Sequence, residues 1–191
     1  MEKKEDTLTR LAAIFTQMVD NAATPDRRWQ NIALAREAFV LMNVLPDVLP
    51  GEYETAAEKA DLLDRMLDQM DEFLVPRFCI SVRREMARLN PADENNGSML
   101  QQLRDFIDES LPMEEYCLRY RRMLRFDPVE RSARYEQVIA DVEAEIAEEL
   151  EDLPRGMGFC FAYWNAKSKA LYKRGIAWSS PHLMNPGVMF D

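Results

Sequence analysis

The stretch from Thr55 to Leu89 reads TAAEKADLLDRMLDQMDEFLVPRFCISVRREMARL and decides the fold. Apolar residues recur in it at spacings of three and four, which is the period of one face of an α-helix. The spacing continues on both sides of Pro76, and proline kinks or ends a helix. We therefore expect either one long kinked helix or two helices that meet at Pro76, and we place this element at the centre of the fold.

Outward from this stretch, the same spacing recurs along most of the chain, and no segment alternates as a strand would. Proline, glycine or asparagine stands at the breaks in the pattern. The sequence predicts an all-α, multihelical single domain of about seven or eight helices. The predicted helices outside Thr55–Leu89 cover residues 7–22, 25–44, 98–110, 112–124, 128–150 and 158–174.

Local signals set several of these boundaries. Residues 95–98, Asn-Asn-Gly-Ser, predict a loop that ends in a serine N-cap. Asp127 followed by proline predicts the start of the helix over 128–150, and Gly175 predicts the end of the helix over 158–174. Residues 38–44 are apolar nearly all round, so we expect them deep in the core.

The last residues, 176–191, have almost no periodicity but are rich in apolar side chains. A free tail would be more polar, so we expect this one to lie extended across the helices. The predicted organisation is a helical domain over 1–175 with the tail, 176–191, as part of the same domain. The predicted core includes Phe15, Trp29, Phe39, Leu63, Leu67, Met70, Phe106, Val138, Val142, Phe161 and Trp164.

The composition limits the class of protein. The chain has 191 residues, 47% of them hydrophobic, which suffices for a core without disulfides. Cys79, Cys117 and Cys160 are far apart and set among apolar residues, so we predict three buried, reduced thiols. The start of the sequence has no apolar signal segment, and no stretch approaches the roughly 18 apolar residues of a spanning helix. We expect a cytoplasmic protein without a membrane partner.

No motif in the sequence specifies an enzyme. His182 is the only histidine, and it is predicted to be a surface or capping residue. Catalytic triads, His-based zinc sites and di-iron bundles all need histidine in a defined constellation. Phosphate-binding glycine loops and calcium loops are missing too. We therefore expect no metal and no cofactor, and we favour a protein that is not an enzyme.

Charge is distributed unevenly between two neighbouring helices. Residues 127–152 carry ten acidic side chains against two arginines, whereas residues 155–175 carry five basic side chains and no acidic one. The simplest interpretation is an antiparallel helix pair with complementary faces, although each exposed ion pair contributes only about 0–1 kcal/mol. The net charge of −10 disfavours a nucleic-acid partner over the chain as a whole.

Aromatic residues are interleaved with the basic ones between 155 and 178, which is also typical of single-stranded nucleic-acid grooves. Phe161, Trp164, Ser168 and Leu171 lie at helical spacing, however, and this favours a core stripe. Both interpretations stay open. The candidate binding residues are Trp164, Asn165, Lys167, Lys169, Arg174, Trp178 and His182.

A second basic cluster lies at the C-terminal end of the helix predicted over 112–124. It comprises Arg119, Arg121, Arg122 and Arg125, and the dipole at a helix C-terminus is enough to explain it.

The closing run, from Trp178 to Asp191, reads WSSPHLMNPGVMFD. It resembles the end of a family of small uncharacterised all-helical bacterial proteins. The resemblance implies an all-helical fold and a bacterial source, and it assigns no activity to any residue.

Three functions remain in view. The first is a non-enzymatic interaction or scaffold protein that binds an unidentified protein or a second copy of the chain. The 12 methionines and the aromatic residues favour it, because they suit adaptable contact surfaces. The second is single-stranded nucleic-acid binding through residues 155–178. The third is an enzyme or carrier with a small-molecule pocket among the helices.

Overall fold

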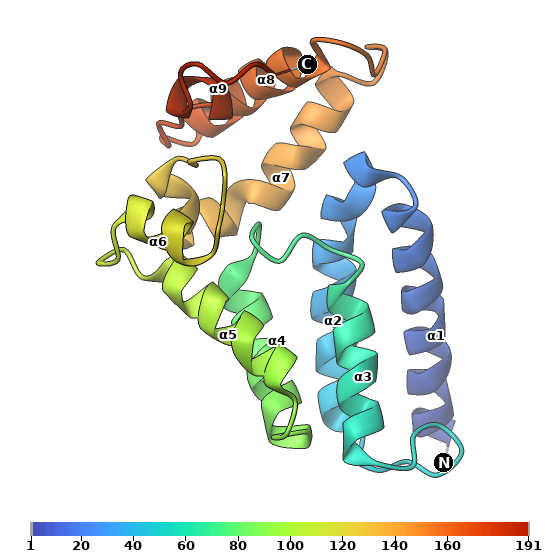
Figure 1. Ribbon diagram of the computed structural model, residues 1–191. Coiled ribbons are helices and arrows are strands. Elements are labelled where there is room, and N and C mark those ends of the chain that lie inside the picture. Colours follow the sequence, from blue (N-terminus) through green and yellow to red (C-terminus); the bar gives the residue numbers. More distant parts are fainter. Residues whose placement is uncertain (1, 191) are drawn as a thin grey trace. The chain divides into compact units, whose positions relative to one another are not determined.

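The computed structural model describes residues 2–190 and confirms the all-α prediction (Figure 1). These residues form nine α-helices and two 3-10 helices, with no β-strand among them. The chain divides into two compact units, Met1–Arg104 and Asp105–Asp191. The N-terminal unit contains α1 (Glu2–Ala22), the 3-10 helix Pro25–Gln30, α2 (Asn31–Val44), α3 (Ala56–Leu67), α4 (Pro76–Leu89) and most of α5 (Glu94–Ile107). The C-terminal unit contains α6 (Met113–Arg119), the 3-10 helix Pro128–Arg131, α7 (Ala133–Glu149), α8 (Phe159–Lys173) and α9 (Pro181–Met184).

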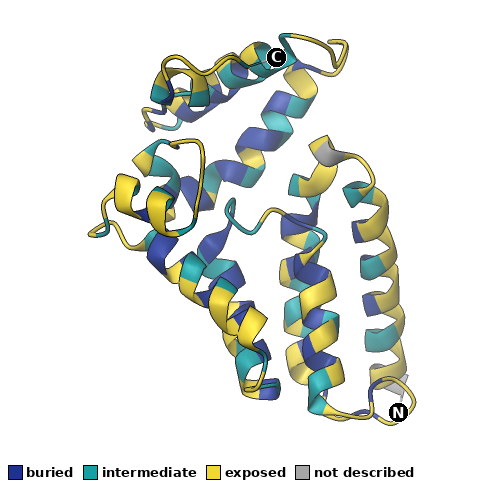
Figure 2. Cartoon of the chain, viewed as in Figure 1, coloured by how far each residue is buried: buried dark blue, intermediate teal, exposed yellow. Residues whose placement is uncertain are grey.

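The N-terminal unit is built from two helix pairs. The first helix, α1, packs against α2, and α3 packs against α4. Leu63, Leu67 and Met70 are buried as predicted. Figure 2 shows buried positions interspersed with exposed ones along these helices, as expected where one face of each is covered. The core also holds Lys59, whose ammonium donates to the Leu45 carbonyl oxygen at 2.9 Å. Such hydrogen bonds offset the free-energy cost of burying the charged ammonium in an apolar core.

Pro76 starts a new helix and does not kink a long one. Helix α3 ends at Leu67, and the chain turns over residues 68–75 before α4 begins with Pro76 in its first turn. Proline favours this position because its missing N–H would have no intrahelical partner there. The open choice between one helix and two is thus resolved as two, and the prediction of a long central helix is wrong.

Helix α2 is not buried all round, which corrects the prediction for residues 38–44. Ala38 and Met42 are buried, whereas Val40 and Val44 are exposed. The neighbouring helices α1 and α3 pack against α2 without covering these two valines. Composition alone therefore misread a one-sided surface helix as a core helix.

The predicted loop at residues 95–98 is also wrong, because α5 starts at Glu94. The Asp93 carboxylate accepts the backbone N–H of Asn96 at 3.0 Å and so caps this helix. Asn96 is buried, and its amide donates to the Arg83 carbonyl oxygen at 3.0 Å. This tertiary contact thus stabilises a helix in a sequence that is typical of a turn.

In the C-terminal unit, α7 packs against α8. Asp127 does cap a helical turn, but that turn is the 3-10 helix Pro128–Arg131. Ser132 then caps α7 itself, since its hydroxyl accepts the backbone N–H of Tyr135. Gly175 has a φ of 72° just after α8, as a C-cap glycine requires.

The C-terminal tail packs on its own unit. Asn185 is buried, and its side chain both accepts the Arg125 backbone N–H at 2.8 Å and donates to the Arg125 carbonyl oxygen at 2.9 Å. The tail is not extended throughout, because Pro181–Met184 forms the helical turn α9. Proline at the first position fixes φ near the helical value and favours this turn.

The three cysteines are free thiols. Cys79 is buried as predicted, whereas Cys117 and Cys160 are only half-buried. The prediction of three buried thiols therefore holds for Cys79 alone.

Candidate functional site

Helix α8 presents a basic face to the acidic face of α7, which confirms the predicted helix pair. Lys173 and Arg174 both bind the Glu145 carboxylate, with an Arg174 Nη1 to Oε2 distance of 2.8 Å. Lys169 lies 3.9 Å from the carboxylate of Glu149, farther along α7. Residues spaced along one face of each helix meet in this way in an antiparallel pair.

Lys167 is the buried member of this face. Its ammonium lies 3.2 Å from the Glu143 carboxylate and 3.3 Å from the Tyr163 hydroxyl, and that hydroxyl donates to Glu143 at 2.6 Å. Burial by itself lowers the pKa of Lys167, but the oxygens of Tyr135, Tyr163 and Glu143 outweigh burial and raise the pKa well above its usual value. Lys167 therefore stays charged inside the unit.

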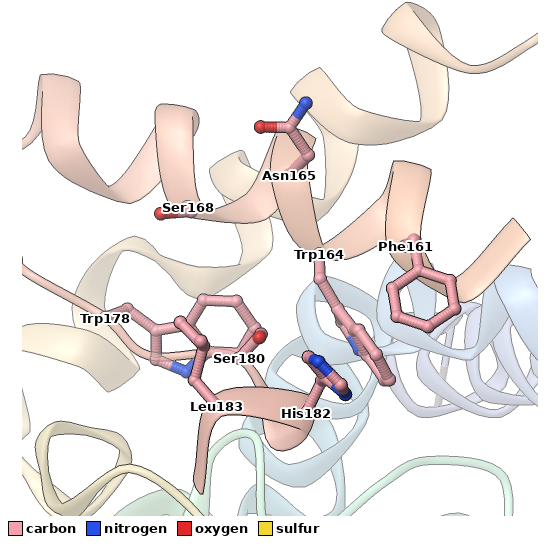
Figure 3. A pocket seen from close by; sticks show the side chains of 8 residues that line it. All are labelled: Phe161, Trp164, Asn165, Ser168, Trp178, Ser180, His182 and Leu183. Atoms are coloured by element: carbon pink, nitrogen blue, oxygen red, sulfur yellow. The ribbon is translucent and has the colours of Figure 1, made fainter. Parts of the chain in front are cut away.

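A second face of α8 lines a pocket of about 310 Å³ (Figure 3). The helix contributes four residues at the spacing i, i+3, i+4, i+7, which places them on one side. The tail contributes the remaining four. The lining residues are Phe161, Trp164, Asn165, Ser168, Trp178, Ser180, His182 and Leu183.

Aromatic rings form most of the pocket wall. The ring of Phe161 meets those of Trp164 and His182 edge-to-face, with centroids 5.3 and 5.6 Å apart. Phe190 packs edge-on against Trp164 at 5.0 Å, outside the lining set. Edge-to-face contacts of this kind stabilise ring pairs beyond simple burial. In Figure 3 the amide of Asn165 points away from these rings.

Two charged residues outside the lining set contact Trp178. Its indole Nε1 donates to the Glu130 carboxylate at 2.8 Å, and the Lys167 ammonium lies 5.4 Å from its ring centroid. Burial raises the pKa of Glu130, while the Trp178 hydrogen bond and the charge of Lys167 oppose the rise. Trp178 is thus positioned by a hydrogen bond to Glu130 and by a cation–π contact with the same lysine that pairs with α7.

The structure divides the predicted binding residues between the two faces. Trp164, Asn165, Trp178 and His182 line the pocket. The three basic candidates, Lys167, Lys169 and Arg174, pair with carboxylates of α7.

The predicted core stripe on α8 is wrong in part. Phe161 is exposed to 44%, and Trp164 is half-buried, because the tail covers this face incompletely. Sequence reasoning also missed Ser180 and Leu183 as pocket residues. Helical spacing signalled the α8 half of the pocket, whereas no local pattern signalled the half supplied by the tail.

The lining residues do not form a catalytic constellation. Ser180 and His182 both border the pocket, but none of the carboxylates that the structure describes lines it to orient the histidine. Over residues 2–190, no group of three or more histidine, cysteine or carboxylate side chains is placed to hold a metal ion. Within the same residues, every helix is too short or too polar to cross a membrane. The arrangement offers a partly open and mainly apolar pocket.

The comparisons with known proteins found no match to this chain among protein-family models, curated proteins or solved structures. The site is therefore interpreted from its own geometry.

Proposed function

We propose that this chain is a cytoplasmic, non-enzymatic protein-interaction module, and that the pocket between α8 and the tail receives an uncharged apolar side chain of a partner protein. The observation that carries the proposal is an aromatic wall, in which Trp178 is held by Glu130 and Lys167, together with exposed apolar side chains. Two lining residues, Phe161 and Leu183, are 44% and 70% exposed, and Met189, the chain neighbour of the Phe190 that packs on Trp164, is 94% exposed. Such residues gather on the surface of a soluble unit where another protein covers them.

The chemistry of the wall supports a protein ligand. Tryptophan, phenylalanine and methionine are enriched at the centres of protein interfaces, where rigid aromatic anchors contribute most of the binding energy. The volume lies at the lower end of the range that encloses small-molecule ligands. A pocket of this size suits one protruding side chain of a partner.

The charged residue that contacts the ring of Trp178, Lys167, favours an uncharged occupant of the pocket. A cation is attracted to the face of an indole ring, but Lys167 already lies 5.4 Å from the ring of Trp178. A second cation on that ring would be repelled by the first. An aliphatic or aromatic side chain has no such penalty.

The two alternative functions have less support. Carboxylates of α7 already neutralise Lys167, Lys169 and Arg174. These basic side chains are therefore not available to bind the phosphates of a nucleic acid. An enzyme or carrier would bring Lys167 and a carboxylate into the pocket beside His182, and the lining formed by residues 2–190 includes neither.

A peptide-display selection on the full-length chain tests the proposal. We expect recovered peptides to share one apolar anchor residue and to change the fluorescence of Trp164 and Trp178. Their affinity for the double variant Phe161→Ser/Leu183→Ser should fall about tenfold or more, since both substitutions remove apolar contacts from the pocket. A Val40→Ser/Val44→Ser variant, which changes exposed residues of α2, is the matched control. Peptides without a shared apolar anchor, or equal binding to all variants, would overturn the proposal.

A further inference from the structure

Residues 118–125, which we call the arginine loop, leave α6 and enter an exposed turn of sequence LRYRRMLR. Helix α6 ends at Arg119, so Arg121, Arg122 and Arg125 lie beyond the helix. The helix dipole, which acts over the last turn, therefore does not explain them. This corrects the interpretation of the arginine cluster as a set of C-terminal helix residues.

Both ends of the arginine loop are anchored to the C-terminal unit. Tyr116 and Phe126 are buried, and their rings pack edge-to-face at 5.8 Å. At the far end, the buried Asn185 side chain forms hydrogen bonds to the backbone N–H and carbonyl of Arg125. A loop fixed on a rigid scaffold is the usual setting for a binding segment.

The tip between these anchors is exposed and strained. Arg121 has a φ of 51°, and it is the only residue other than glycine with a positive φ between residues 2 and 190. Non-glycine residues adopt this left-handed conformation at an energetic cost, and such residues cluster at functional sites. Leu118 and Met123, on either side of Arg121, are 82% and 95% exposed.

The side chains of the tip are only partly neutralised. Arg119 binds the carboxylates of Asp105 and Glu115, whereas no carboxylate among the described residues pairs with Arg121. Arg125 lies 3.9 Å from Glu114, at the limit of an ion pair. Arginine and methionine together thus form an exposed, positively charged and apolar surface on an acidic chain.

We propose that the arginine loop is a second docking site, which binds an acidic peptide segment of a partner protein. Guanidinium groups bind carboxylates through two parallel hydrogen bonds, and Leu118 and Met123 supply apolar contacts between those pairs. Arginine and methionine are both enriched at protein interfaces, and the tip contains no lysine.

The size of the positive surface favours a peptide over an extended anionic surface. The C-terminal unit has 16 acidic residues against 11 basic ones, so a membrane or a nucleic acid lying across it would also meet carboxylates. A short acidic segment can contact the arginine loop alone. At physiological salt the charges beyond about 8 Å are screened, so the local positive charge decides the contact.

Fluorescence anisotropy with a labelled peptide of repeated Glu-Asp-Leu units tests this site on the full-length chain. We expect binding that weakens as salt is added, and no binding of the matched Gln-Asn-Leu peptide. The Arg121→Gln/Arg125→Gln variant should bind about tenfold more weakly. The Arg27→Gln/Arg28→Gln variant is the matched control, because it removes the same charge from an exposed turn of the N-terminal unit and should bind normally.

Competition experiments separate the acidic peptide from other anions. Mixed phosphatidylserine–phosphatidylcholine vesicles and single-stranded oligouridylate should bind the chain more weakly than the acidic peptide does. The proposal is overturned if the acidic peptide does not bind, if it binds both arginine variants equally, or if only the vesicles or the RNA bind through Arg121 and Arg125. The Phe161→Ser/Leu183→Ser variant should bind the acidic peptide normally, which distinguishes this site from the pocket.

Discussion

The two faces of α8 differ in how the protein uses them. Toward α7 the helix presents Lys167 and Arg174, and carboxylates neutralise both. Toward the tail it presents Phe161 and Trp164, and the tail covers them only in part. The carboxylates of α7 neutralise the charges of the first face, which we call the completed face. The tail leaves apolar surface exposed on the second, which we call the open face. The comparison teaches that a helix rich in basic and aromatic residues need not bind nucleic acid. Ion pairs within the fold can neutralise its basic side chains while its aromatic rings stay partly exposed.

The largest effect expected on the completed face is that of Lys167→Met. The substitution leaves the buried Glu143 carboxylate without its cation, and only Tyr163 still donates to it. We expect the free energy of unfolding to fall by about 3 kcal/mol, as for other buried ion pairs that lose one partner. Urea denaturation followed by tryptophan fluorescence measures the loss.

Two further variants show whether the loss comes from an unpaired charge. Lys169→Met removes a long, exposed pair with Glu149 and should change stability by at most about 1 kcal/mol. The double variant Lys167→Met/Glu143→Leu has no charge left to desolvate and should regain most of the loss. Equal destabilisation by Lys167→Met and Lys169→Met would show that burial of the Lys167–Glu143 pair does not account for the loss.

A smaller effect is expected from Trp178→Phe, which tests the support of the pocket wall. Phenylalanine keeps a ring in the wall but cannot donate to Glu130. A buried acceptor that loses its donor costs about 1–3 kcal/mol, and we expect a loss of stability in that range. Glu130→Gln keeps an acceptor for the indole N–H, so it should be less destabilising than Trp178→Phe. The reverse order in a urea titration would contradict this account of the wall.

The sequence could predict the completed face better than the open one. Alternating blocks of acidic and basic residues in consecutive helices predict pairing, because opposite charges at helical spacing meet in an antiparallel hairpin. The open face depends on hydrogen bonds that join Trp178 to Glu130 and Asn185 to Arg125, across 48 and 60 residues. No local pattern encodes contacts of that range.

The wrong predictions in the N-terminal unit have the same origin. Turn-type residues around Asn96 form a helix because Asp93 caps it and the Arg83 backbone accepts its amide. Val40 and Val44 are exposed because α2 has neighbours on one side only. At Asn96 a tertiary contact outweighed the local turn propensity. At Val40 and Val44 no neighbouring helix covers the apolar side chains.

The carboxylates of the two faces should contribute to the pH dependence of stability with opposite signs. Lys173 and Arg174 lower the pKa of Glu145 below its ordinary 4.5, so the native state binds fewer protons than the unfolded state. Its contribution to stability is present above pH 4.5 and is lost as the pH falls through the native pKa. Burial raises the pKa of Glu130 instead, so its contribution is present below pH 4.5 and is lost as the pH rises through the native pKa.

Two glutamine variants measure these contributions in urea titrations over the acidic range. Glu145→Gln should make stability less dependent on pH below 4.5. Glu130→Gln should make stability rise more steeply with pH above 4.5, because a contribution that falls with pH is removed. The same change of slope in both variants would show that the carboxylates of the two faces are not perturbed in opposite directions.

The smallest effect on folding is expected at the rim of the pocket. Leu183→Ser replaces a side chain that is 70% exposed, so the free energy of unfolding should change by no more than about 0.5 kcal/mol. Phe161→Ser also removes ring contacts with Trp164 and His182 and should lower the free energy of unfolding by about 0.5–1 kcal/mol. Stability and binding then separate, because the same substitutions should weaken the apolar-anchored peptides. If either variant were destabilised as strongly as Trp178→Phe, its side chain would be part of the core. The open face would then be as complete as the one toward α7, and the unit would present no apolar receptor to a partner.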